Sequence, residues 1–565
     1  MQQVTIQEHK KNSTVDVCII GSGAGGAPIA YKLAQAGFSV VVLEKGPWVT
    51  EKDFFKEEVG VFGGHKYVPD IKDEYHTFEL RQKGHWKKYS SGDLNLTFWN
   101  GNVVGGSSNF MSGYFHRLKP KDFALNTHYP QIMGANIVDW PITYQELEPF
   151  YTEVDQEVGV SGVIPTHRFA EFHSQPFPFP PTIEHPLTHW FDTTFNSINV
   201  DLAKTPRAIL SKATPNRKAC EYSGFCGGYG CHTGAKGSAR AALLDKAVVT
   251  GHCQIIPNSQ VFNIETNDKS AVKIHYFSNF NRKKTIEARI YVVACQAIES
   301  VRLLLNSKNR FFPKGLGNDY DQVGKNIIFS AGGSAKCTVL KKDLPLLYQS
   351  KAHVTGPFFN RNTQEYYEIK DDVLLIKGGT IDFFIYENNV GQLINQTKVD
   401  KELVWGNELT HNINDFFKEK VTITAELFLD WSPNDDCFVS LDKNKRDRWG
   451  MPVANVRINS VDHDEYLAQL INKKIQSIFN AFKPVKIEFS HSVLPPTNLQ
   501  QGGCRFGLDP KTSVLDKNCK IHSLNNVYVT DGSFMPTGGS VPPTYTIYAN
   551  SFRVAKHLIS LLLVK

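Results

Sequence analysis

The sequence predicts an α/β protein in which an α+β domain with an antiparallel sheet is inserted into a discontinuous first domain. Strand–turn–helix patterns with glycine-rich turns appear near 15–44, 288–305 and 522–563. The stretches between them, about 135–210 and 335–490, alternate aromatic and polar residues, as half-buried strands do. The 565 residues, 41% of them hydrophobic, suffice for more than one core.

The first unit, residues 15–44, contains the parts of a nucleotide-binding turn in order. An apolar run rich in β-branched residues predicts a buried parallel strand, which leads into a G-x-G-x-x-G turn at Gly21, Gly23 and Gly26. A helix and a second strand follow, with Glu44 at the end of that strand. The glycines allow close approach to a pyrophosphate, the helix N-terminus attracts its charge, and the acid accepts from a ribose hydroxyl. This order predicts a Rossmann-like unit that binds an adenine dinucleotide.

The bulk composition excludes several classes of partner. The net charge of +6 is spread along the chain without a polybasic block, which argues against nucleic acid as the main partner. No run of 18 apolar residues occurs, so we expect no membrane span. The N-terminus lacks the apolar segment of a secretory signal, and ten cysteines do not make a disulfide scaffold, so we expect a cytoplasmic protein.

Five blocks of sequence resemble the glucose-methanol-choline (GMC) flavin oxidoreductases, and within them the flavoprotein subunits of gluconate and fructose dehydrogenases. The blocks are 15–46, 101–117, 219–244, 292–305 and 502–539. The resemblance implies FAD, and no second G-x-G-x-x-G unit appears that could hold a nicotinamide cofactor. We therefore expect an FAD-binding domain from 1–134, 211–334 and 491–565, and a substrate-binding domain from 135–210 and 335–490.

The resemblance also implies which residues contact FAD. They are a loop along the cofactor, a strand at the adenine, two residues near the pyrophosphate and ribityl chain, and a helix start at the flavin N1/O2 edge. In that order these are Gly105, Gly106, Ser107 and Ser108; Val261; Asp531 and Gly532; and Pro543 and Thr544. Some relatives attach FAD through a histidine in the loop. Phe110 holds that position here, so we expect non-covalent FAD.

Three cysteines are clustered in a glycine-rich loop with the spacing C-x5-C-x4-C, namely Cys220, Cys226 and Cys231. Closely spaced soft thiolates are what iron–sulfur ligation requires. The gluconate and fructose dehydrogenase type resembles C-x2-C-x2-C-x4-C and implies a three-iron (3Fe–4S) cluster, although Ser223 replaces one cysteine here. Structural free thiols are the main alternative, and a zinc site is a third.

The usual GMC catalytic pair is missing from both of its expected positions. A histidine normally precedes the block that begins at Gly502, but Leu499 or Gln500 stands there, and Pro542 occupies the second position. Neither glutamine nor proline can act as a base. Gln500 and Gln501 could still orient a substrate oxygen.

Three accounts of this loss remain open. His491 is a candidate base if the following segment is an insertion, and His116, beside the flavin loop, is another. In the third account, the protein no longer oxidises alcohols and keeps FAD for another purpose.

The leading hypothesis is an FAD-dependent dehydrogenase that acts on a CH–OH group of a sugar, aldonate or polyol. By resemblance, hydride goes to flavin N5 and electrons pass through the cysteine cluster to a small subunit and a cytochrome. Co-export with a signal-bearing partner makes a periplasmic location the alternative to the cytoplasm. Two other hypotheses are a divergent flavoprotein that performs a tailoring oxidation, isomerisation or elimination, and an inactive FAD-binding scaffold.

Overall fold

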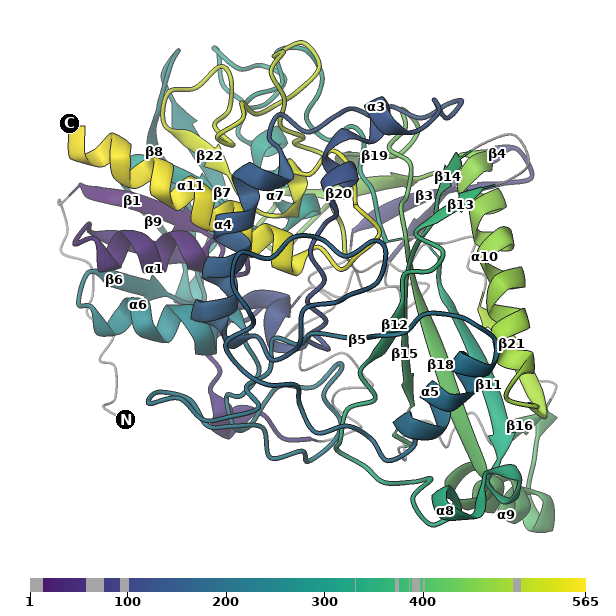
Figure 1. Ribbon diagram of the computed structural model, residues 1–565. Helices are drawn as coiled ribbons and strands as arrows, with labels where there is room; N and C mark the ends of the chain where they lie inside the picture. Colours follow the sequence, from purple (N-terminus) through teal and green to yellow (C-terminus); the bar gives the residue numbers. More distant parts are fainter. Residues whose placement is uncertain are drawn as a thin grey trace.

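The computed structural model places the two predicted kinds of sheet in two lobes that lie side by side (Figure 1). The residues it describes are 14–56, 76–91, 101–330, 332–370, 375–385, 387–388, 397–399, 402–490 and 499–564.

A five-stranded parallel sheet in the order β22-β10-β1-β2-β6 forms the centre of the first lobe. Its strands are β1 (Val15–Ile20), β2 (Val40–Leu43), β6 (Cys253–Ile256), β10 (Ala288–Val293) and β22 (Val527–Val529). Strands β1 and β2 are apolar and almost entirely buried, as expected where helices cover a parallel sheet. The G-x-G-x-x-G turn that follows β1 therefore lies at the carboxyl edge of the sheet, where nucleotides bind.

Helices from three parts of the chain surround this sheet (Figure 1). They are α1 (Ala27–Gln35), α6 (Asp245–Val249), α7 (Ala297–Asn306) and the long C-terminal α11 (Thr544–Val564). A smaller antiparallel sheet contains β7 (Gln260–Thr266), β8 (Ala271–Ser278) and β9 (Arg282–Ile286). The strand and helix that the sequence predicts near 288–305 are β10 and α7.

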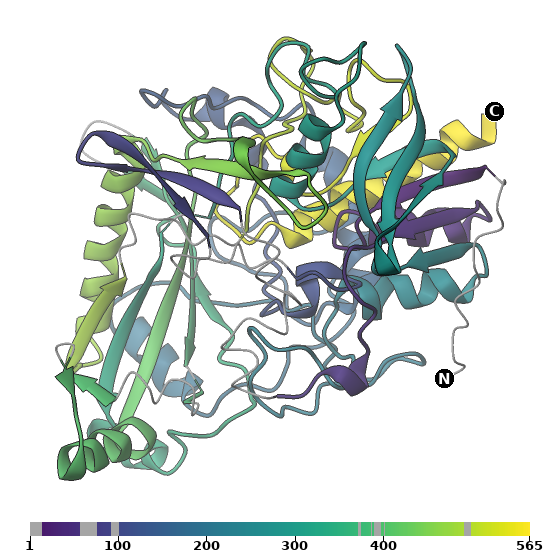
Figure 2. The ribbon, with the colours of Figure 1, turned by 180° about the vertical axis from the view of Figure 1, so that it is seen from behind.

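The second lobe is built on a six-stranded antiparallel sheet in the order β21-β11-β18-β15-β12-β5. Its strands are β5 (Ala203–Lys204), β11 (Ser334–Leu340), β12 (Arg361–Thr363), β15 (Gly379–Ile385), β18 (Lys420–Leu429) and β21 (Lys486–Ser490). Helix α10 (Asp462–Asn480) packs along β11 and β21, as both views show (Figures 1 and 2). The structure thus confirms the predicted α/β fold with an antiparallel α+β lobe.

A four-stranded sheet in the order β19-β20-β3-β4 joins strands from both predicted domains. It pairs the hairpin β3 (Thr77–Gln82) and β4 (His85–Ser90) with β19 (Phe438–Arg446) and β20 (Pro452–Ile458). The domain boundaries proposed from the sequence stay a prediction.

The remaining elements are short, apart from α4 and α5. The helices are α3 (Leu125–His128), α4 (Tyr144–Val154), α5 (Thr188–Ser197), α8 (Leu346–Gln349) and α9 (Gly406–Asn414). The strands are β13 (Glu368–Lys370), β14 (Leu375–Lys377), β16 (Lys398–Val399) and β17 (Glu402–Leu403).

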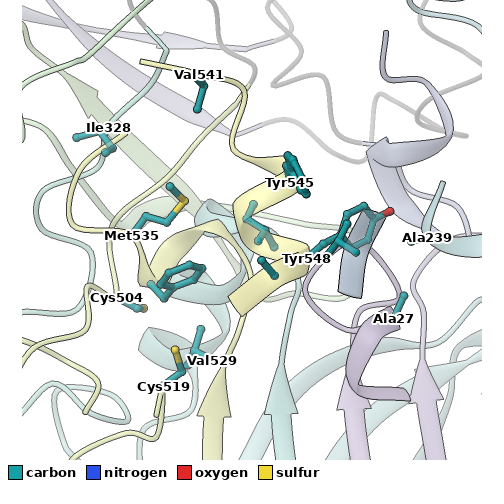
Figure 3. Close-up of a cluster of buried hydrophobic side chains, with 14 of the residues drawn as sticks. Ala27, Ala239, Ile328, Cys504, Cys519, Val529, Met535, Val541, Tyr545 and Tyr548 are labelled. Carbon is teal, nitrogen blue, oxygen red and sulfur yellow. The ribbon is translucent and has the colours of Figure 1, made fainter. Parts of the chain in front are cut away.

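The start of α11 lies in the core of the first lobe (Figure 3). Tyr545 and Tyr548 are fully buried there, together with Val529 of β22 and Ala27 of α1. Because side chains from segments 500 residues apart pack on this helix, its N-terminus is held firmly against the sheet edge. None of the helices in the described ranges has the length and apolar character needed to cross a bilayer.

Candidate active site

A cavity of about 560 Å³ opens at the carboxyl edge of the parallel sheet. Most of the residues predicted to contact FAD line it. These are Gly21, Gly23, Glu44, Gly106, Ser107, Ser108, Val261, Asp531, Gly532, Pro543 and Thr544. Gly26 and Gly105 are not part of this lining. The structure therefore brings together residues from five distant segments around a single space, which we call the first cavity.

The glycine turn leaves room for a ligand on one side only. Gly21 has a φ of +97°, and a Cβ atom there would lie 2.2 Å from the carbonyl oxygen of Ala294. A Cβ on Gly26 would lie 2.2 Å from the carbonyl oxygen of Gly21. A Cβ on Gly23 would meet no atom within 4 Å. Two glycines thus press the turn against the sheet, and the third faces the open cavity, as a pyrophosphate site requires.

Glu44 links the turn to the end of β2. Its Oε2 atom accepts hydrogen bonds from the Ser22 amide at 3.0 Å and the Ser22 hydroxyl at 2.5 Å. Its Oε1 atom accepts from the Gly46 amide at 2.9 Å. Burial raises the pKa of this carboxyl group, although these hydrogen bonds act to lower it. Glu44 lines the cavity and its Oε1 atom accepts only one of the two hydrogen bonds open to it, so Glu44 can still accept from a ribose hydroxyl.

The serine loop and the C-terminal loop are tied to neighbouring segments. Ser108 donates its hydroxyl to the Gly105 carbonyl at 2.6 Å and accepts from the Ala239 amide at 2.8 Å. Asp531 accepts from the Ser533 amide at 2.9 Å and from the Ser300 hydroxyl. Both loops are held by hydrogen bonds before any ligand is added, so this side of the cavity is preorganised.

A second cavity, of about 670 Å³, lies between the antiparallel sheet and the cysteine loop. It shares Ser112, Tyr114 and Glu426 with the lining of the first cavity. Its other lining residues include Arg207, Phe225, Cys226, Phe358, Phe359, Phe384, Glu387, Phe417, His185 and His353. The two cavities therefore adjoin each other at the boundary between the lobes.

The predicted catalytic residues are not brought together in one place. Gln500 lines the first cavity, and its Oε1 atom accepts a hydrogen bond from the Gln296 side chain. Gln501 is buried and lines neither cavity. His116 is also buried away from both cavities, with its Nε2 atom 2.8 Å from Asp382 Oδ2. His491 lies outside the described residues. A catalytic role for each of them stays a prediction.

Comparison with known proteins places this geometry in a family. The two GMC oxidoreductase family models match residues 207–329 and 433–551, and a model of NAD(P)-binding Rossmann-like domains matches 19–50. The chain belongs to the GMC oxidoreductase family. It is therefore an FAD-dependent oxidoreductase, and the first cavity is the place where its residues fit FAD.

Relatives of this GMC oxidoreductase align along nearly its whole length. The 2-methyl-1,2-propanediol dehydrogenase of Mycolicibacterium austroafricanum is 27% identical, with 96% of this chain and 95% of the relative covered. The paromamine 6'-oxidase of Streptomyces fradiae is 27% identical, with 96% and 90% covered. The fructose dehydrogenase large subunit of Gluconobacter japonicus is 25% identical, with 97% and 98% covered.

Solved structures show the same fold at lower sequence identity. The formate oxidase of Aspergillus oryzae aligns with a TM-score of 0.64 and 14% identity, covering 98% of this chain and 99% of its own. At this sequence identity, the similarity shows only that the two proteins share a fold.

The three loop cysteines of the GMC oxidoreductase lie beside a buried lysine. Burial raises the pKa of the Cys220 thiol to about 11. Burial also acts to raise the pKa of Cys231, but the Lys236 ammonium and hydrogen bonds from Thr233 and Lys236 lower it overall. Lys236 itself donates to the carbonyl oxygens of Cys226 at 2.9 Å and Tyr229 at 2.7 Å.

These cysteines do not form a recognisable metal site. No group of three His, Cys, Asp or Glu side chains in the described ranges is arranged to hold a metal ion. The geometry gives the predicted three-iron cluster no support, and the cluster stays a prediction.

Sequence reasoning missed three side chains at the junction of the cavities: Tyr114, Arg207 and Glu426. Glu426 is the one acid in β18, whose other residues are apolar except for Lys420 and two threonines, and it is only partly buried. Burial and the nearby Asp382 raise its pKa and Arg207 acts to lower it, with a net value of about 7. The one available signal was this acid between the apolar residues Ala425 and Leu427, because no motif contains it.

Proposed function

We propose that this GMC oxidoreductase uses non-covalently bound FAD to oxidise a CH–OH group of a sugar, aldonate or polyol. The observation that carries the proposal is the pair of adjoining cavities, one lined by dinucleotide-binding residues and one by aromatic and charged side chains. A flavin enzyme needs such a pair, because substrate and cofactor must meet at one boundary.

The lining of the second cavity suits a polyhydroxylated substrate. Aromatic faces pack against sugar C–H groups, and charged side chains bind hydroxyl groups. The Arg207 guanidinium lies 4.5 Å from the ring centres of both Tyr114 and Phe358 and donates to the Ser112 carbonyl at 2.8 Å. A guanidinium fixed in this way could also bind the carboxylate of an aldonate.

The residues of the first cavity would hold FAD and leave it non-covalent. Gly23 gives the pyrophosphate room, and the α11 N-terminus at Thr544 offers partial positive charge to the flavin end. Phe110, which lines the cavity, has no nucleophilic atom to form a covalent bond. When bound, FAD supplies the two-electron acceptor for the hydrogen that leaves the substrate carbon.

Transfer of electrons to a partner protein is part of this proposal. Support comes from the fructose dehydrogenase relative, which by name is the large subunit of an assembly. A small subunit and a cytochrome are the proposed partners, in the cytoplasm or, with co-export, in the periplasm.

A three-iron cluster at the cysteine loop would relay those electrons. Iron analysis of the purified protein tests this, with Cys226→Ala as the variant and Cys253→Ala, a buried cysteine on β6, as the matched control. Iron that is present in wild type and lost only in the first variant would support the cluster. Iron content unchanged by the first variant would contradict it.

A second candidate is a tailoring oxidation in a biosynthetic pathway. It is favoured by the paromamine 6'-oxidase relative and by the first cavity, which is lined by no histidine from the part of the chain that the structure describes.

The deciding experiment is an anaerobic visible spectrum of the purified holoenzyme, recorded while sugars, amino sugars, aldonates, polyols and simple alcohols are added in turn. Bleaching of the oxidised flavin band by a sugar, aldonate or polyol is the expected result. Bleaching only by an amino sugar would favour the tailoring oxidation. A flavin that dithionite reduces but that none of these compounds bleaches would contradict both candidate functions. It would favour the hypothesis of an inactive FAD-binding scaffold.

A further inference from the structure

We propose that Glu426 is the group that takes the proton from the substrate hydroxyl, an inference that rests on the proposed alcohol oxidation. In this inference, a carboxylate from the opposite lobe takes the role of the catalytic histidine that is missing here.

The position of Glu426 follows from the alternation of side chains along β18. Glu426 and Phe428 line the first cavity, and Lys420 and Thr422 line the second. The intervening residues Ile423, Ala425 and Leu427 belong to the hydrophobic core. Because successive side chains of a strand point to opposite faces, Glu426 is held on the cavity face by the packing of its neighbours.

The other ionisable side chains around the first cavity are not suited to act as the base, because they are paired with other groups or stay protonated. Glu44 and Asp531 accept the hydrogen bonds described above, and Glu299 pairs with His76 at 2.8 Å and Arg302 at 3.1 Å. Burial raises the pKa values of the Tyr114 hydroxyl and the Cys295 thiol well above neutrality, so both stay protonated. The last is Lys45, which is a cation at neutral pH.

The side chain of Glu426 forms no hydrogen bond with any residue of the described ranges, whereas its backbone pairs with β11 and β15. The two nearest comparable carboxylates differ from it in this respect. Asp382, its register partner on β15, is bonded to His116 and to the Thr205 hydroxyl at 2.7 Å. Glu387 accepts from the backbone amides of Phe225 and Gly356. Glu426 is thus the carboxylate that lines both cavities and whose side chain accepts no hydrogen bond from the described residues.

The charges around Glu426 favour reversible protonation near neutral pH. Asp382 on β15 disfavours the ionised form, and Arg207, from the segment beside the second cavity, favours it. The facing residue on β11, Ser334, carries no charge. Together with burial, these groups bring the pKa to about 7, which is the range in which a general base is most effective.

The proton and electron balance of the step is complete. The O–H bond of the alcohol breaks, and its proton goes to a carboxylate oxygen of Glu426. The hydrogen leaves the carbon as a hydride, with both electrons of the C–H bond, and passes to the flavin oxidant, and the carbon becomes a carbonyl. Glu426 afterwards returns its proton to water through the second cavity.

The kinetic test compares Glu426→Gln, Glu426→Asp and wild type as holoenzymes on whichever alcohol bleaches the flavin. We expect Glu426→Gln to lower kcat by 10²–10⁴-fold and to abolish the rise of kcat/KM with pH near 7, as loss of a general base does. Glu426→Asp should recover part of the rate, with the pH profile displaced. Glu488→Gln is the matched control, because Glu488 lies on β21 of the same sheet and is half-exposed. It should leave both kcat and the pH profile unchanged.

A second readout does not depend on activity. In infrared difference spectra between pH 5 and pH 9, wild type should show a protonated carboxyl band that disappears near pH 7, and Glu426→Gln should lack it. Flavin content per protein, measured from the visible spectrum, should be equal in the two.

The outcomes separate this inference from the proposed function. A wild type that oxidises an alcohol while Glu426→Gln oxidises it equally well overturns the inference alone. So does loss of the pH dependence in His491→Ala but not in Glu426→Gln. A wild type that oxidises no alcohol overturns the proposed function and the inference together.

Discussion

Gly21 and Gly23 stand two residues apart in one turn, yet a side chain would have opposite effects at the two positions. In Gly21→Ala the Cβ atom would overlap a backbone carbonyl, and the residue would have to keep a φ of +97°. We expect this variant to lose about 2–4 kcal/mol of stability, measured by urea unfolding of the apoprotein.

Gly23→Ala serves as the matched comparison, since its Cβ atom meets open space. Its stability should change by about 0.5 kcal/mol or less, but its Kd for FAD, measured by flavin fluorescence quenching, should rise at least about tenfold because the methyl group occupies the pyrophosphate space. Unchanged FAD affinity in Gly23→Ala would contradict the placement of the pyrophosphate.

The raised pKa of Glu426 also predicts how stability depends on pH. The folded state holds this proton up to about pH 7, whereas the ordinary glutamate value is 4.5. Since the folded state binds more protons in this window, ionisation of Glu426 costs stability as the pH rises from 4.5 to 7.

The neutral variant Glu426→Gln avoids that cost. We expect it to be more stable than wild type at pH 8, by at most about 3 kcal/mol, and the difference to fall below about 1 kcal/mol at pH 5. Urea unfolding at both pH values measures this. An equal difference at the two pH values would show that the carboxyl group titrates in its ordinary range.

At the scale of elements, α4 and α11 are held together through the buried Arg117. Its guanidinium pairs with Glu148 at 3.0 Å and Asp155 at 2.6 Å and donates to the Tyr545 hydroxyl at 3.1 Å. Because Tyr545 is in the first turn of α11, this contact also positions the helix start at the first cavity.

Arg117→Met should destabilise the protein by about 3–5 kcal/mol, because it leaves buried carboxylates without a partner. Arg117→Lys should recover only part of the lost stability, since an ammonium group cannot form the same fork of hydrogen bonds as a guanidinium group. Arg168→Met, which removes an exposed pair with Glu365, should cost about 0.5 kcal/mol or less. Thermal unfolding of the three variants measures the differences, and equal losses for the buried and the exposed pair would refute the argument.

At the scale of the whole molecule, the first cavity draws on segments from residue 20 to residue 547. A ligand that binds there stabilises only the folded chain. We expect FAD at 100 times its Kd to raise the free energy of unfolding of the apoprotein by about 2.7 kcal/mol, as thermal unfolding in graded FAD would show. Acid precipitation of the holoenzyme should release all of the flavin into the supernatant, and flavin retained in the pellet would contradict non-covalent binding.

The sequence by itself determined the first β–α–β unit, and most of the residues it assigned to FAD line the first cavity, although their contact with FAD stays a prediction. The unit could be predicted because it spans 30 consecutive residues, so that periodicity, glycine spacing and the acid at the strand end report short-range contacts. The later segments carried recognisable family blocks, which linked Ser107 and Asp531 to the same site although they lie far apart in the chain.

Only the tertiary structure decided what lies on the substrate side. The alternation of β18 indicates that Glu426 and Leu427 point to opposite faces, but it does not say which face meets a cavity. That depends on the pairing of β18 with β11 and β15, which lie about 80 and about 40 residues earlier in the chain, and on α10, which packs against β11 and β21. His116 illustrates the converse, since its proximity in sequence to the flavin loop gave no indication that Asp382 would hold it away from both cavities. Long-range strand pairing, which leaves no local pattern, therefore set the chemistry of this site.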